Sequence, residues 1–150
     1  MKIAKLQFIC LVVLSLMFTQ TATASQNRGE SRMLEIEAVA AIYYGAFRGE
    51  FSAADIPLRD EINFKSPIAE INKAAAFRGA LGNLFTRVQK LTIDTQLMDE
   101  TTVMSFYWLD LGAPGGPIPM AERLTVKDGA ITAIQLLFDP SLLPAPPKAE

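Results

Sequence analysis

One carboxyl group lies in an otherwise apolar, alternating segment. Glu122 shares a period of two with Met120, Leu124 and Val126, so in a strand these side chains point to the same side. A carboxyl group buried there should have a raised pKa, and it could donate a hydrogen bond or transfer a proton. The alternative is an ion pair with a neighbouring arginine, or an outward-facing position at the rim.

Two further residues could take part in proton transfer. Asp110 follows Phe106 and Trp108 on one face of a predicted strand, so it lies either at a pocket mouth or as a solvated carboxylate at the strand end. Tyr43 and Tyr44 are adjacent in a helical segment, and we expect only one of them to face inward. An inward hydroxyl group could bind a ligand or Glu122, or the ring could pack with its hydroxyl group at the surface. The candidate catalytic residues are therefore Glu122, Asp110 and Tyr43.

The missing residue types narrow the chemistry. The sequence has no histidine, and its single cysteine, Cys10, lies in the N-terminal apolar run. This excludes histidine-based triads and imidazole metal sites, and beyond that run it excludes thiol nucleophiles and zinc–thiolate sites. Proton transfer would use carboxylates, tyrosine or lysine. We expect no metal and no other cofactor.

Apolar side chains near these groups form either a plain core or the wall of a ligand pocket. The residues expected to contact a ligand are Phe64, Met104, Phe106, Trp108, Met120 and Leu124. Met104, Phe106 and Trp108 share one face of a strand, and Tyr107, Leu109 and Leu111 share the other. Because both faces are apolar, we expect helices to cover one and a second copy of the chain to cover the outer one, which we take to be the face of Tyr107.

The N-terminus has the features of a secretory signal peptide. Lys2 and Lys5 precede an apolar run at 6–18, and an Ala-Thr-Ala sequence at 22–24 fits a cleavage site. The run is shorter than the roughly 20 residues of a spanning helix, although an uncleaved anchor is the alternative. We expect residues 1–24 to be removed, 25–32 to be a loose leader, 33–139 to form one domain and 140–150 to be a Pro-rich tail. The protein would then be exported to a periplasm or secreted.

Charge argues against a nucleic-acid partner. Of 14 basic residues, Lys2 and Lys5 would leave with the signal peptide, so 12 would remain against 16 acidic residues, a net charge near −4. Nothing basic clusters. No stable membrane insertion is expected after cleavage.

Helical patterns come before strand patterns in the remaining chain. A helix is predicted from Met33 to Gly49, a short one over 51–60, and a long one that begins at Ser66 and Pro67. Within the long helix, Gly79 and Gly82 would mark close packing or a bend. A strand is predicted at 62–65.

Strands follow from residue 91 onward. Leu91, Ile93, Thr95 and Leu97 would share one face of the first of them. Further strands are predicted over 103–111, 120–126 and 130–138. The Asp-Gly at 128–129 indicates a tight hairpin between the last two.

The element order, together with the motifs at 47–51, 62–67, 126–131 and 138–139, resembles the nuclear transport factor 2-like superfamily, in its SnoaL-like and ketosteroid-isomerase-like branches. The resemblance implies an α+β fold: a cone-shaped half-barrel in which a curved antiparallel sheet wraps around three N-terminal helices. An apolar pocket and a homodimer are common in this superfamily.

Carried over residue by residue, the isomerase site matches only in part. Ser66, before Pro67, stands where that branch has its aspartate base, and serine is no base at neutral pH without a partner. Glu122 corresponds to the oxyanion-hole carboxylic acid. The first-helix tyrosine of that branch falls at Ile42, one residue before Tyr43.

These observations leave three functions open. The first is an exported domain whose apolar pocket binds a small lipophilic molecule, such as a steroid-like or polyketide-like metabolite. The second is an isomerase, dehydratase or hydrolase that uses Glu122 and needs no cofactor. The third is a non-catalytic, dimeric protein-interaction or assembly module.

Overall fold

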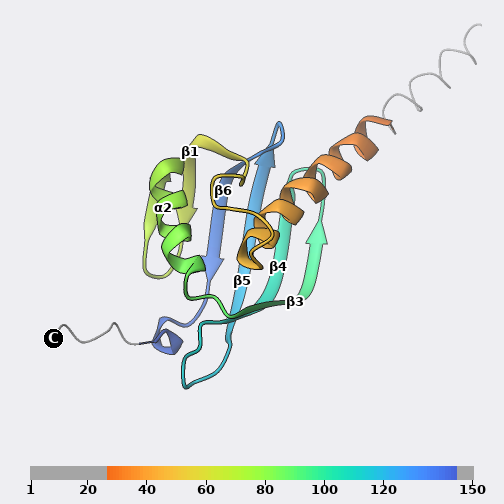
Figure 1. Ribbon diagram of the computed structural model, residues 1–150. Coiled ribbons are helices and arrows are strands. Elements are labelled where there is room, and N and C mark those ends of the chain that lie inside the picture. The colour runs from red at the N-terminus through yellow and green to blue at the C-terminus, as the bar shows by residue number, and fades with distance from the viewer. Residues whose placement is uncertain (1–26, 145–150) are drawn as a thin grey trace, which may run out of the picture.

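The computed structural model describes residues 27–144, which form two α-helices and a six-stranded sheet. The first helix occupies residues 27–47 and the second is α2 (Ala74–Phe85). The strands are β1 (Leu58–Lys65), β2 (Glu70–Lys73), β3 (Lys90–Met98), β4 (Thr102–Asp110), β5 (Ile118–Lys127) and β6 (Ala130–Leu137), followed by the short 3₁₀ helix η1 (Pro140–Leu142). Both α-helices lie on the same face of the sheet (Figure 1). Both the predicted signal peptide and most of the Pro-rich tail lie outside the described residues.

The sheet is mixed, with the strand order β2-β1-β6-β5-β4-β3. Neighbouring strands are antiparallel except for β1 and β6, which run parallel. The α+β half-barrel prediction is confirmed, and two details of it change: one strand pair is parallel, and two helices stand in place of three. Within the described residues, no helix has the length and apolar content needed to cross a membrane.

The first helix buries a stripe at helical spacing. Ile36, Val39, Tyr43 and Phe47 are all buried against the sheet, as predicted. Gly49, at φ +77°, takes the left-handed conformation that follows many helix ends. The helix also includes residues 27–32, so the predicted loose leader is wrong over that range. Arginine and glutamate there are compatible with a helix, and they are exposed to water.

The predicted short helix over 51–60 is wrong: residues 51–57 form a loop that passes between the two helices, and residues 58–60 begin β1 (Figure 1). The Asp55 carboxylate accepts hydrogen bonds from the backbone N–H and the hydroxyl group of Ser52. Pro57 has no N–H and disfavours helix for the residue before it, Ile56, which is fully buried. The Pro57 carbonyl group instead accepts a bond from the Ile131 N–H at 2.8 Å, where β1 joins β6.

The predicted helix start at Ser66 is also wrong. Ser66 closes the turn between β1 and β2, where its hydroxyl oxygen accepts the Ala69 N–H at 3.0 Å. Helix α2 begins only at Ala74, without a side-chain cap. Gly79 and Gly82 are exposed, and a Cβ atom at either would meet nothing within 4 Å. Close packing therefore does not explain them.

Strand β3 changes face at an irregularity. Ile93 pairs with Tyr107 while Thr95 pairs with Phe106, so Asp94 is an extra residue on β3. Before this point Leu91 faces the helices. Beyond it Leu97 is 67 % exposed, so the predicted common face for these residues is wrong.

Strand β4 alternates as predicted, but its two faces are the reverse of those assigned from sequence. Ser105, Tyr107 and Leu109 lie beneath the helices, whereas Met104, Phe106 and Trp108 are on the outer face. A period of two shows which residues share a face, and it does not show which face the helices cover. The hairpin between β5 and β6 is confirmed, with positive φ at both Asp128 and Gly129, as a type I′ turn requires.

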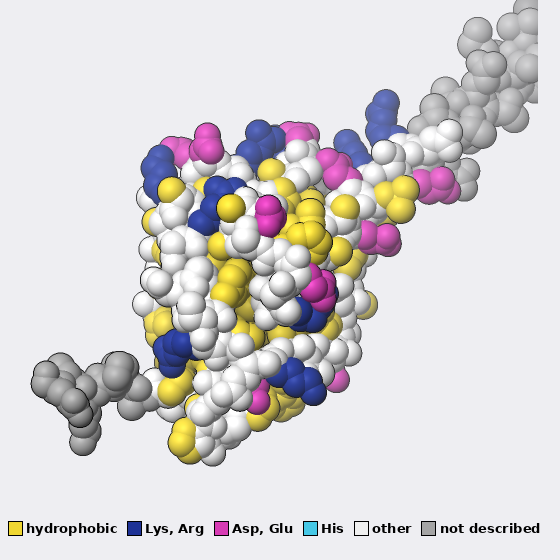
Figure 2. Space-filling model, viewed as in Figure 1, with side chains coloured by type: hydrophobic (Ala, Val, Ile, Leu, Met, Phe, Trp, Pro, Cys, Tyr) yellow, Lys and Arg dark blue, Asp and Glu magenta, His cyan; other side chains and the backbone are white. Residues whose placement is uncertain are grey.

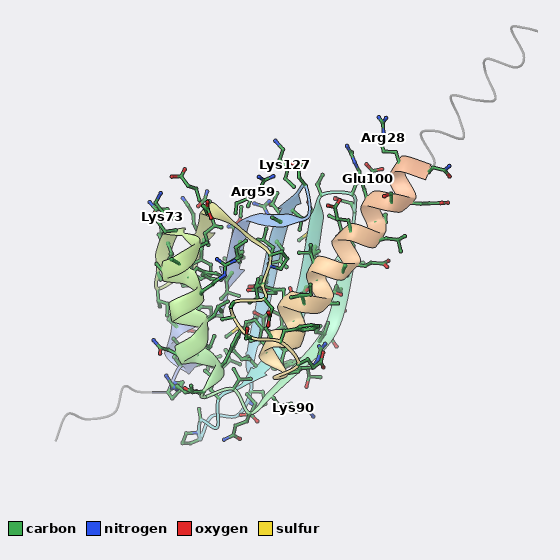
Figure 3. All side chains as sticks on the ribbon, turned by 45° about the horizontal axis from the view of Figure 1, so that its top comes forward. Arg28, Arg59, Lys73, Lys90, Glu100 and Lys127 are labelled. Carbon is green, nitrogen blue, oxygen red and sulfur yellow. The ribbon has the colours of Figure 1, made fainter. Side chains whose placement is uncertain are left out.

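Hydrophobic side chains are visible between the two helices, and charged ones lie along the upper edge of the same face (Figure 2). Of the six charged residues labelled in Figure 3, five lie at the ends of strands and helices, and Glu100 lies in the turn between β3 and β4. On the face seen in Figure 2, the apolar centre between charged ends indicates a site for an apolar ligand between the helices and the sheet.

Candidate functional site

Glu122 lies in the middle of β5, directly opposite Ser105 on β4 and Leu136 on β6. It is only 4 % exposed, on the side that the helices cover, as the alternation with Met120, Leu124 and Val126 predicted. Apart from Ser105, it is the only polar residue that the structure buries within residues 27–144. A buried carboxyl group needs polar partners, since leaving it without them costs several kcal/mol.

Two hydroxyl groups of the first helix bind the two carboxyl oxygens. The Tyr43 hydroxyl group donates to Oε1 at 2.8 Å, and the Tyr44 hydroxyl group donates to Oε2 at 3.0 Å. Among residues 27–144, no arginine binds this carboxyl group, so the ion-pair alternative does not hold. The prediction that only one tyrosine faces inward is wrong. Adjacent helical residues diverge by about 100°, but the carboxyl group sits between the two rings and accepts from both.

The pKa of Glu122 reflects two opposed effects. Burial disfavours the charged form, and hydrogen bonds from Tyr43, Tyr44 and Tyr107 favour it. Burial is the larger effect and raises the pKa of Glu122 to about 7. Burial and the nearby carboxylate also raise the pKa of Tyr43 and of Tyr107 well above the ordinary value, so both rings keep their protons. The site therefore holds one carboxyl group that changes charge near neutral pH, among neutral hydroxyl groups.

A cavity of about 210 Å³ adjoins this carboxyl group. It lies between the end of the first helix, α2, the turn from β1 to β2, and strands β4 and β5. Its polar lining residues are Tyr43, Ser66, Tyr107 and Glu122. Its apolar lining residues are Phe47, Phe64, Ile68, Ala69, Ile71, Phe77, Ala80, Leu81, Leu84, Leu109, Leu111, Met120, Leu136, Phe138 and Leu143.

Of the residues selected from sequence, four line this cavity: Tyr43, Phe64, Met120 and Glu122. Leu124 is fully buried but does not line it. Asp110 also lies apart from it, and its carboxylate accepts the Gly112 N–H at 2.8 Å in the turn after β4. The structure therefore does not bring Asp110 together with Glu122.

The three remaining ligand-contact candidates, Met104, Phe106 and Trp108, lie on the opposite face of the sheet. They are 55 %, 41 % and 42 % exposed, respectively. With Leu97 and Leu137 they form the outer patch. A shallow hollow of about 330 Å³ lies on this face; four residues of the patch line it (Leu97, Met104, Phe106 and Leu137), and so do Ser105 and Glu122. None of the three lines the 210 Å³ cavity, because β4 presents its other face to the helices, and as ligand contacts they stay predictions.

Sequence reasoning missed several residues of the cavity. Tyr107 had been assigned to the outer face, although its alternation with Leu109 shows that the two belong together. Phe77 is spaced three and four residues from Ala74 and Leu81, a helical signal that was available. Phe138 and Leu143 follow the last strand, in a segment without regular periodicity, so the sequence pattern could not predict that they line the cavity. No group of three potential metal ligands occurs among residues 27–144.

No protein-family model and no curated protein matches the chain. Solved structures do. A protein from Kribbella flavida DSM 17836, described only as of known function, is 28 % identical at a TM-score of 0.60 over 68 % of this chain and 84 % of its own. A steroid delta-isomerase from Pseudomonas aeruginosa is 19 % identical at a TM-score of 0.60, and the match covers 71 % of this chain and 80 % of that one. An M. tuberculosis LEH-like epoxide hydrolase is 19 % identical at a TM-score of 0.53, and the match covers 77 % of this chain and 87 % of that one.

The chain has the nuclear transport factor 2-like fold, as the sequence predicted. Structural neighbours with this fold include isomerases and epoxide hydrolases. At these identities the comparison gives the fold alone, because one fold hosts many functions. What this chain does must be argued from its own site.

Proposed function

We propose that the protein binds a small, mostly apolar organic molecule in the 210 Å³ cavity, with one oxygen atom of the ligand against Glu122 and Tyr43. The observation that carries this proposal is a carboxyl group, buried among hydroxyl donors, at the wall of an apolar cavity. Such a site combines apolar contact area with one or two polar groups that fix orientation.

The size of the cavity limits the ligand. A cavity of about 150 Å³ holds a benzene molecule, so 210 Å³ accommodates one ring with substituents or two small rings. Four fused rings exceed this volume. We therefore favour a one- or two-ring ketone, phenol or ester over the steroid-like ligand considered from sequence.

The test is a binding assay with cyclohexanone, 1-indanone and 2-naphthol, in which changes in the NMR chemical shifts of the protein report binding. Trp108 fluorescence does not serve, because Trp108 is on the outer face. Leu84→Trp places a large ring in the cavity lining, and Leu97→Trp makes the same exchange on the outer patch. We expect binding to be lost only in the first variant. If no probe binds, or if both variants bind equally, the proposal is refuted.

An enzymatic role is an extension of the same proposal. Glu122 would transfer a proton next to a carbonyl group, since a group with a pKa near the working pH both gives and takes protons readily. The cavity lining contains no second carboxylate, and Ser66 uses its hydroxyl group in the β1–β2 turn. One group would therefore perform both transfers. Exchange of the α-hydrogens of bound 1-indanone for deuterium, measured by NMR, tests this role. Full exchange in Glu122→Gln would reject it.

A second candidate function, assembly through the outer patch, has its own observation. Leu97, Met104, Phe106, Trp108 and Leu137 are exposed large apolar residues on one sheet face, and such patches commonly mark interfaces. The expected partner is a second copy of the chain. This face replaces the one assigned from sequence. Sedimentation at micromolar concentration tests it, and a protein that remains monomeric there would exclude the homodimer.

Export is also part of the proposal. The positive start, apolar run and Ala-Thr-Ala sequence support cleavage after Ala24. Mass spectrometry of the protein produced from the full-length gene should then give a chain that starts at Ser25. Recovery of only the uncleaved chain from the membrane fraction would favour the anchor alternative.

A further inference from the structure

The hollow of about 330 Å³ lies on the sheet face opposite the cavity. Strand register places most of its lining residues in two rows that cross β3, β4, β5 and β6. The first row is Thr95, Phe106, Ala121 and Leu137, and the second is Leu97, Met104, Arg123 and Gln135. Ser105 and Glu122 pair with each other between the rows, and their side chains belong to the face that the helices cover.

The first row has a small residue between two large ones. Ala121 pairs with Phe106 on one side and with Leu137 on the other. Both large side chains are exposed to water. An apolar group that lies over Ala121 therefore contacts both of them and removes apolar surface from water, which stabilises the complex.

The second row supplies a cation. Arg123 lies two residues along β5 from Ala121, so the two Cα atoms are about 7 Å apart and both side chains are on the same face. The Arg123 guanidinium group donates to the side-chain oxygen of Gln135 at 3.2 Å, which helps to hold it beside the hollow. None of the ion pairs within residues 27–144 includes Arg123. A guanidinium group has several N–H donors, so donors remain for a ligand.

We propose that the outer hollow binds an amphipathic anion, namely a small molecule with one carboxylate on an aromatic or branched apolar body. The carboxylate pairs with Arg123, because the planar fork of a guanidinium group binds two carboxylate oxygens at once. The apolar body lies over Ala121, between Phe106 and Leu137. This site uses neither the cavity nor the Glu122 carboxyl group, so the proposal goes beyond the function proposed above and does not depend on it.

Charge complementarity favours this ligand over a second copy of the chain as the occupant of the hollow. An interface with two-fold symmetry pairs one patch with itself. A second copy would therefore bring a second Arg123 to the same face, and none of the five apolar residues of the outer patch supplies an anion. Four of those residues line the hollow, so the ligand and a second copy exclude each other there.

The test is a titration with 2-naphthoate, in which changes in the NMR shifts of the Ala121 and Leu137 methyl groups report binding. The matched ligand is 2-naphthamide, which has nearly the same shape and no charge. We expect 2-naphthoate to bind about tenfold more tightly, because charge-assisted hydrogen bonds are stronger than neutral ones. Arg123→Gln should abolish this preference. Arg87→Gln, which removes an exposed arginine just after α2, should retain it.

Three results would overturn the proposal: equal binding of the two ligands by the wild type, a preference that survives in Arg123→Gln, or methyl shifts that disappear in Leu84→Trp, which would assign the ligand to the cavity. Sedimentation with saturating 2-naphthoate adds a fourth. A dimer that persists there without a shift at Ala121 would show that a second copy occupies the hollow. The cavity is tested separately with neutral ligands, so failure of either proposal is distinct from failure of the other.

Discussion

Replacing Glu122 by glutamine should change how stability depends on pH. The pKa of Glu122 is raised from the ordinary 4.5 to about 7 in the folded protein. Between these values the folded protein holds a proton that the unfolded chain has released, so stability falls as pH rises. The loss begins above about pH 4.5 and is complete above about pH 7. The pKa difference of about 2.5 units, at about 1.36 kcal/mol per unit, corresponds to a loss of about 3 kcal/mol in the free energy of unfolding.

Glutamine cannot ionise, and it keeps the shape of the neutral carboxyl group. The Glu122→Gln variant should therefore lose this pH dependence, and it should gain stability relative to the wild type by about 3 kcal/mol between pH 4.5 and 8. Urea unfolding at half-unit pH intervals measures the difference. Glu37→Gln is the matched control, because the Glu37 side chain is exposed on the first helix. Its curve should run parallel to the wild-type curve. If the Glu122→Gln curve does the same, the burial argument is refuted.

Three further predictions concern the helices and the outer patch. Gly79→Ala and Gly82→Ala should each stabilise α2 by up to about 1 kcal/mol, because both positions are exposed and open; a loss of stability in urea unfolding would contradict this. Gly49→Ala should cost about 1–2 kcal/mol, because its φ is +77°; an unchanged unfolding midpoint would contradict it. Trp108 emission should shift to shorter wavelength with rising protein concentration and not in Met104→Glu, because both residues belong to the outer patch; a shift that survives in the variant would assign the association to another surface.

The most useful sequence signals were local ones: hydrophobic periodicity within one strand or helix, and the residue types of one turn. Alternation along β5 placed Glu122 on the buried side without knowledge of its neighbours. The Asp-Gly at 128–129 fixed the last hairpin, because both positions need positive φ. Helical spacing likewise identified the buried stripe of the first helix. These features depend on residues close in sequence.

The errors came from information that is not local. The side of β4 that the helices cover is set by tertiary packing, so the sequence assigned Tyr107 to the outer face and Trp108 to the inner face, the reverse of the structure. The extra residue Asp94 shifts the register of β3 against β4, and no glycine or proline at that point indicates the irregularity in the sequence. At Ser66 the chemistry was right and the element wrong, because a hydroxyl group that accepts a nearby N–H serves a helix start and a turn equally. Tyr43 and Tyr44 both face inward because both donate to the Glu122 carboxyl group, which lies 79 and 78 residues further along the chain, respectively.

The central claim is that the Glu122 carboxyl group lies in a dry site at the wall of a ligand cavity. Its NMR titration, alone and with saturating 1-indanone, tests that claim most directly. We predict a midpoint near 7 for the free protein, and a higher one with the ketone bound, since the neutral form donates to the ketone oxygen. A midpoint near the ordinary 4.5, unmoved by the ketone, would contradict the account.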